Sequence, residues 1–239
     1  MRFERFSVDM AYHSAYTYLS LKGVLAERWA HGPLFGAFTE AAAQITLSPP
    51  AAEPGGAAPR SVQAFYGLKA TGFLYEQLRR NELSDVTGDA VSWLGDVNTV
   101  LTPRRVVQVN VGWFLLHPIE NAERSSRLLR DRYYNGTNAA RLKPERYGSY
   151  HSAVENVVTQ GRDMYTIVLG VVGPPHKGQF FTYEDPARDG RWWMGLRTGW
   201  WCRDEEGIED PVDRVREMVS QSRVDVIALA RVGFSSVID

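Results

Sequence analysis

Residues 106–116 read VVQVNVGWFLL, a run of β-branched, apolar and aromatic residues that follows Pro103 and stops before Pro118. Such side chains favour extended backbone, so the run predicts a buried strand in the middle of the chain. Two similar runs, residues 164–172 and 191–201, predict strands further along. These three segments decide the fold class, because the core must then be built around a sheet.

Weaker patterns predict the remaining elements. Further strands are expected over residues 3–12, 44–47, 62–69 and 224–232. Helices are expected over residues 21–29, 73–80, 120–134 and 211–222. Asp210 and Pro211 suit the N-cap and first position of the last helix, and its unit with the strand over 224–232 is the clearest of these patterns. Residues 90–101 fit either a strand or a loop.

Strands and helices do not alternate strictly along the chain, which disfavours a doubly wound parallel sheet. We therefore expect an α+β fold in which helices pack on one face of antiparallel sheet, with ferredoxin-like halves as a further expectation. The length of 239 residues fits one domain over residues 1–239. Residues 48–60 are rich in proline and glycine and predict an exposed loop within that domain.

Composition limits the class of function. The single cysteine, Cys202, excludes an internal disulfide framework and a thiolate zinc site. No run of 18 apolar residues and no signal-peptide pattern occur, so we expect a cytoplasmic protein without a membrane partner. Phosphate-loop, dinucleotide, zinc-protease and serine-hydrolase motifs are absent, and the five histidines lack metal-binding spacing. The sequence thus predicts no metal and no cofactor, and it favours a non-catalytic role.

The net charge of −1 conceals a basic segment. Residues 124–146 carry seven basic and two acidic side chains, a local charge of +5, with Tyr133 and Tyr134 between them. Arginine binds phosphate and tyrosine stacks on unpaired bases, so this mixture suits single-stranded nucleic acid. The alternative is a solvated helix face whose arginines pair with Glu120, Glu123 and the acidic late segment of the chain. An acidic segment over residues 204–213 leaves open a third use, in which basic and acidic faces of subunits stack.

Several short segments resemble the Cas5-type (RAMP) subunits of CRISPR effector complexes. They are RRNELS at residues 79–84, FERFS at 3–7, Arg104-Arg105 ahead of an apolar strand, and Phe180-Phe181 followed by Asp189-Gly190. The resemblance implies a ferredoxin-like RNA-binding fold with an extended finger, to which residues 48–60 would correspond. A Lys-His pair that some members use for RNA cleavage has no match, since Arg104-Arg105 stands in its place, so the resemblance implies guide-RNA binding alone.

The leading prediction is a non-catalytic, RNA-binding subunit of a multi-protein complex involved in antiviral defence, with single-stranded or guide RNA and other subunits as partners. The residues expected to contact RNA are Arg79, Arg80, Arg104, Arg105, Arg127, Arg130 and Tyr133. One alternative is a structural subunit of a symmetric assembly, such as a capsid, tail or shell. Another is a small-molecule enzyme with a base such as His151 or Glu184, which a pocket with converging polar groups would favour.

Overall fold

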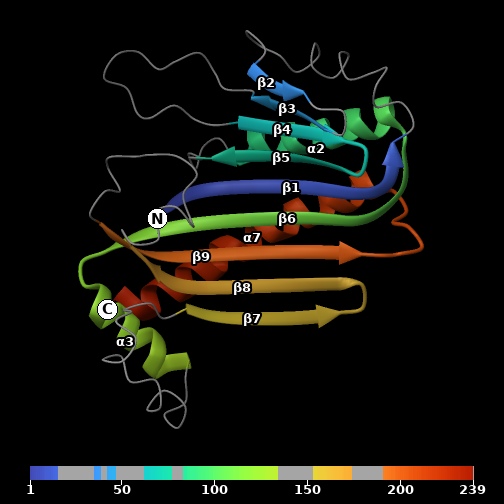
Figure 1. Ribbon diagram of the computed structural model, residues 1–239. Coiled ribbons are helices and arrows are strands. Elements are labelled where there is room, and N and C mark those ends of the chain that lie inside the picture. Colours follow the sequence, from blue (N-terminus) through green and yellow to red (C-terminus); the bar gives the residue numbers. More distant parts are fainter. Residues whose placement is uncertain are drawn as a thin grey trace, which may run out of the picture.

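A computed structural model describes residues 1–15, 35–38, 42–46, 62–76, 83–133, 153–173 and 191–238. Its nine strands form one sheet in the order β2-β3-β4-β5-β1-β6-β9-β8-β7, and every neighbouring pair is antiparallel (Figure 1). The strands are β1 (Arg2–Ala15), β2 (Phe35–Phe38), β3 (Ala42–Thr46), β4 (Val62–Gly67), β5 (Ala70–Glu76), β6 (Pro103–Ile119), β7 (Ala153–Gln160), β8 (Asp163–Val172) and β9 (Trp192–Arg203). The predicted α+β class is confirmed, and the ferredoxin-like halves stay a prediction.

The sheet consists of two halves that meet where β1 pairs with β6, a junction that we call the central seam. In the first half, β1 is followed by the meander β2–β5, whose last strand returns to pair with β1. In the second half, β6 is followed by β7–β9, whose last strand returns to pair with β6. A helix closes each half, α2 (Leu83–Leu101) in the first and α7 (Pro211–Ile238) in the second. The halves therefore repeat one arrangement about the central seam.

All three described helices pack on the same face of the sheet, and α2 and α7 lie behind it in Figure 1. Helix α2 packs on β1 and β5, α7 packs on β6 and β9, and α3 (Ala122–Tyr133) packs on β7, β8, β9 and α7. Between these layers lies the main core, whose largest buried side chains include Trp93 of α2 and Trp113 of β6. Both indoles donate hydrogen bonds between helix and sheet: Trp93 Nε1 to Thr71 Oγ1 at 3.0 Å, and Trp113 Nε1 to Ser222 Oγ at 2.9 Å.

Three sequence predictions are wrong. Residues 73–76 belong to strand β5 and not to a helix, because Thr71, Phe73 and Tyr75 alternate into the core. Residues 90–101 lie in helix α2, where Ala90, Trp93, Leu94 and Val97 form a buried stripe at helical spacing. The third and largest difference concerns residues 224–232.

The predicted strand over residues 224–232 is part of the single helix α7. Its buried side chains recur every three or four residues through the whole segment: Val215, Met218, Val219, Ser222, Val226, Ala230 and Phe234. This spacing places them on one helix face. The β-branched residues near position 224 indicated a strand, but Val224 is exposed, and packing against β6 and β9 outweighs its propensity.

Most other predicted elements are confirmed. The strands near residues 3–12, 44–47, 62–69, 106–116, 164–172 and 191–201, and the helix near 120–134, are all present with small shifts of their ends. Strands β2 and β7 were not predicted. The expected helix over 21–29 and the loop over 48–60 lie outside the described residues. No helix in the described part of the chain is long and apolar enough to cross a membrane.

Candidate functional site

The face of the sheet opposite α2, α3 and α7 carries a pocket at its centre. We call it the helix-free face, because no helix of the described residues packs on it. The pocket has a volume of about 240 Å³ and spans the three neighbouring strands β1, β6 and β9. Its side chains form a grid of three rows, in which β1 contributes Arg5, Ser7 and Asp9, β6 contributes Phe114, Gly112 and Asn110, and β9 contributes Arg197, Gly199 and Trp201. In the sheet register, each of these β6 residues pairs directly with the β1 residue and the β9 residue named at the same place in the three sets.

Arg5 lies in this pocket directly beside a β-bulge. The register between β1 and β6 shifts between Phe3 and Arg5, so Glu4 is an extra residue in β1. Arg5, Ser7 and Asp9 share the helix-free face by ordinary alternation, whereas the extra residue returns Phe3 to the core face, where it is buried. Arg5 Nη2 contacts Glu76 Oε1 at 3.0 Å. The bulge thus ends the regular alternation just beyond Arg5, which is the last residue that β1 contributes to the pocket at this end.

Asp9 is the titratable group of the pocket. Desolvation by burial raises the pKa of its carboxyl from 3.8 to about 6, and a hydrogen bond from the Asn110 side chain partly opposes this rise. The carboxylate is therefore held at a cost to folding stability at neutral pH. Perturbed carboxyl groups in a pocket are common at functional sites, where stability has been exchanged for binding or catalysis.

Two buried polar atoms of the pocket have no hydrogen-bond partner in the described part of the protein. Asn110 Oδ1 is buried and accepts no hydrogen bond, and Arg5 Nε is buried and donates none. Leaving such an atom unpaired costs about 1–3 kcal/mol, so native proteins usually satisfy it or reserve it for a ligand. Arg197 is exposed, and within the described residues its side chain makes no ion pair or hydrogen bond. The pocket thus offers polar groups that the protein itself does not use.

Glycines form the floor of the pocket. A Cβ at Gly199 would lie 2.3 Å from the ring of Trp201, so the indole extends across this glycine. A Cβ at Gly112 would lie 2.8 Å from Ser7 Oγ. The absence of side chains at both positions lets Trp201 and Ser7 lie close to the backbone, and it leaves the space between the three rows open.

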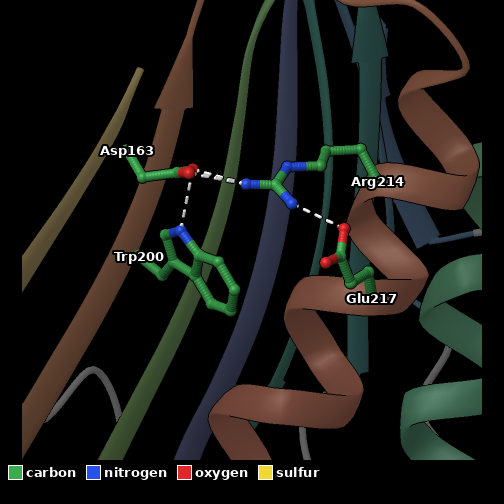
Figure 2. A network of polar contacts seen from close by, with 4 residues as sticks. All are labelled: Asp163, Trp200, Arg214 and Glu217. Carbon is green, nitrogen blue, oxygen red and sulfur yellow. Dashed lines mark hydrogen bonds and ion pairs between the residues drawn. The ribbon is translucent and has the colours of Figure 1, made fainter. Parts of the chain in front are cut away.

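A second polar cluster lies on the opposite, helix-covered face and is fully paired (Figure 2). Arg214 of α7 contacts Asp163 of β8 and Glu217, and Trp200 Nε1 donates to Asp163 Oδ1 at 3.0 Å. Burial acts to lower the pKa of the Arg214 guanidinium, but hydrogen bonds to Asp163, Glu217 and Cys202 outweigh it and raise this pKa. Because each of these groups is satisfied within the protein, we interpret this cluster as structural.

The structure disperses the residues predicted to bind RNA. Arg104 and Arg105 are exposed at the start of β6, whereas Arg127, Arg130 and Tyr133 lie on α3, after the end of that strand. The 14 residues of β6 between Arg105 and Ile119 separate these groups by roughly 45 Å. Arg79 and Arg80 lie outside the described residues, as do His151 and Glu184.

Arg127 fits the alternative prediction for the basic helix, in which its arginines pair with nearby acidic residues. Arg127 Nη2 contacts Glu123 Oε1 at 3.1 Å, one helical turn away, and both side chains are exposed. An exposed pair of this kind contributes little to stability, but it reduces the positive charge that Arg127 offers to a phosphate. The basic face of α3 is therefore weaker than the sequence predicts.

Sequence reasoning missed the pocket because its residues are far apart in the chain. The available signal was polar side chains inside apolar strands: Ser7 and Asp9 between Phe6, Val8 and Met10, and Asn110 between two valines. In a sheet with one covered face, such residues gather on the other face. Which of them meet depends on the strand order, which the sequence did not reveal.

No protein-family model, curated protein or solved structure matches this chain. No group of three or more histidine, cysteine, aspartate or glutamate side chains suited to a metal ion occurs among the described residues. The chemistry of the pocket is thus the basis for assigning a function.

Proposed function

We propose that the protein binds single-stranded RNA on the helix-free face of its sheet, as a non-catalytic subunit of a larger complex. The observation that carries this proposal is the central pocket, in which two arginines, a half-buried tryptophan and unpaired polar atoms meet over a glycine floor. A flat antiparallel sheet with aromatic side chains is a platform on which unpaired bases stack, and arginine binds the phosphates between them.

The proposal moves the main RNA contact from α3 to the sheet. Arg5 and Arg197 occupy the same end of the pocket, and Arg104 is exposed on the central strand β6. Arg127 of α3 lies on a helix of the covered face and pairs with Glu123. The resemblance to Cas5-type subunits agrees with RNA binding, and assignment to a CRISPR effector complex remains part of the proposal.

The test is fluorescence anisotropy with a labelled single-stranded 12-nucleotide RNA at 50 and 200 mM salt. Two or three phosphate contacts predict that the affinity falls about 7- to 20-fold between these salt concentrations. Arg197→Glu should weaken binding strongly, whereas Arg231→Glu, which alters an exposed arginine on α7, serves as the matched control and should not. A variant Arg127→Glu that loses binding while Arg197→Glu retains it would return the site to α3. Absence of binding at 50 mM salt would overturn the proposal.

A second candidate, a subunit that self-associates into a symmetric assembly, is favoured by the sheet edge at β7. Residues 155–160 of this edge strand are exposed, and Val157 and Val158 are each 54% exposed. An exposed, largely uncharged edge strand is a template for further pairing. Two β7 strands could form an antiparallel pair that is centred between Val157 and Val158. Val157 of one copy would then face Val158 of the other, and Glu155 would face Gln160, so that no like charges meet.

Light scattering after size-exclusion chromatography tests this candidate. Self-association through β7 predicts a dimer or larger species that Val158→Lys converts to monomer, while Val224→Lys, at an exposed valine on α7, leaves it unchanged. A monomer at all concentrations would exclude it.

A further inference from the structure

The pocket has two chemically different ends. At one end Arg5 and Arg197 lie on either side of Phe114, and at the other Asp9 and Asn110 lie next to Trp201. The ends are four residues apart along each strand, which is about 13 Å between Cα atoms, and the side chains shorten this distance. A ligand that fills the pocket therefore has an anionic end and a planar end that donates hydrogen bonds.

The planar end is defined by acceptors. Asp9 supplies two carboxylate oxygens, and Asn110 Oδ1 is buried without a partner, while the Asn110 amide group donates to Asp9. A base that satisfies these oxygens must present adjacent donors on one edge. Guanine does so with N1–H and the N2 amino group, whereas adenine, cytosine and uracil each place acceptors next to a single donor group. Trp201 provides a ring on which such a base can stack.

The anionic end is defined by two guanidinium groups. Arg5 uses Nη2 to contact Glu76 but keeps a buried Nε–H without a partner. Arg197 is exposed and unpaired among the described residues. The guanidinium groups of Arg5 and Arg197 outnumber the carboxylate of Glu76 at this end, which leaves a net positive charge. The planar set of N–H donors on an arginine suits a phosphate.

We infer that the central pocket binds a guanine nucleotide, with the base edge on Asp9 and Asn110, the ring on Trp201 and the phosphate between Arg5 and Arg197. This inference rests on the proposed function in one respect: the nucleotide is taken to be one unit of a bound RNA strand. A free guanine nucleotide has the same chemistry, so the experiment must distinguish the two sources.

The experiment combines isothermal titration calorimetry and anisotropy on the full chain at pH 7.5 and low salt. Calorimetry compares GMP with AMP, CMP, UMP, IMP and guanosine. Anisotropy compares an oligouridine with the same strand carrying one central guanosine. We expect GMP to bind at least tenfold more tightly than the other nucleotides, including IMP, which lacks the N2 amino group. The guanosine-containing RNA should bind more tightly than oligouridine by a similar factor.

Two variants assign the ends. Asp9→Asn should abolish the preference for GMP over AMP, while Asp225→Asn, at an exposed acid on α7, should preserve it. Arg197→Ala should weaken GMP but not guanosine, which lacks the phosphate. Thermal unfolding of each variant checks that the fold is intact. A preference for guanine that survives Asp9→Asn would overturn the assignment of the base end.

The outcomes separate this inference from the proposed function. RNA binding without base preference, together with no binding of GMP, leaves the proposed function standing and overturns the guanine site. Binding of GMP without binding of RNA supports the pocket assignment, identifies the free nucleotide as its ligand and overturns the RNA proposal. Binding of neither overturns both.

Discussion

Arg214 donates from Nη2 to both carboxylate oxygens of Asp163, at 2.6 and 2.8 Å, and thereby ties the first turn of α7 to the first residue of β8. The guanidinium also lies over the ring of Trp200, 5.3 Å from its centroid, on strand β9 between β6 and β8. Both members of the pair are only 22% exposed. The contact therefore fixes the start of the long helix against the second half of the sheet.

Breaking this pair should destabilise the protein. Asp163→Ala leaves the Arg214 charge partly buried and removes the acceptor of Trp200, for an expected loss of about 2–3 kcal/mol in the free energy of unfolding. Urea denaturation followed by circular dichroism measures it. The exposed pair of Arg216 and Asp213 is the control, since Asp213→Ala should cost less than about 1 kcal/mol. Equal losses at both sites would contradict the structural role of the buried pair.

Asp9 predicts a stability that depends on pH. Burial raises the pKa of this carboxyl from 3.8 to about 6, so between these values the folded state binds a proton that the unfolded state has released. The contribution of Asp9 to stability is therefore present at low pH and declines as the pH rises through 6. Asp9→Asn should raise the free energy of unfolding by up to about 3 kcal/mol at pH 7.5 and by little at pH 3.5. An equal gain at both pH values in urea unfolding would show that the carboxyl is not perturbed.

The indole of Trp113 depends on Ser222 of α7. Ser222→Ala removes the acceptor of a buried N–H group at 2.9 Å, for an expected loss of about 1–2 kcal/mol. Ser220→Ala, at an exposed position two residues earlier on the same helix, is the matched control and should change stability by less than about 0.5 kcal/mol. Chemical denaturation compares the two variants, and similar values for both would argue against the hydrogen bond.

A substitution at Gly199 should weaken RNA binding and leave the protein folded. In Gly199→Ala the new Cβ would overlap the Trp201 ring, so the indole must leave its place over the pocket floor. Loss of one stacked base costs about 1–3 kcal/mol, which corresponds to a decrease of about 5- to 160-fold in RNA affinity. The control is Gly88→Ala on α2, where a Cβ meets nothing within 4 Å. That variant should retain RNA affinity in the anisotropy assay and gain about 0.5–1 kcal/mol of stability. Unchanged affinity in Gly199→Ala would remove Trp201 from the site.

The sequence predicted the strands well because each carries its own local pattern. Residues 106–116 and 164–172 are rich in β-branched residues, and residues 191–201 in aromatic ones, which favours extended backbone wherever the segment lies in the sheet. Residues 73–76 were harder, because a short apolar run fits a helix or a strand equally well. Only pairing with β1 and β4 resolves it as a strand.

The error at residues 224–232 has a different origin. Local composition there favours a strand. The segment is helical because its buried face packs on the sheet, where it contacts Trp113 and other residues of β6 and β9. The candidate site was unpredictable for the same reason. Asp9 and Asn110 are ordinary polar residues until the register makes them partners, and the same register places Arg5 beside Phe114 at the other end of the pocket.

The central seam has a consequence for how the protein folds. Val8 pairs with Val111, so the residues that line the pocket are joined across about a hundred positions of intervening chain. Contacts of such high contact order form late, after the local meanders and helices have reduced the entropy of closing so large a loop. Neither half alone carries both Asp9 and Arg197. Ligand binding at this pocket would therefore report that the last long-range step of folding is complete.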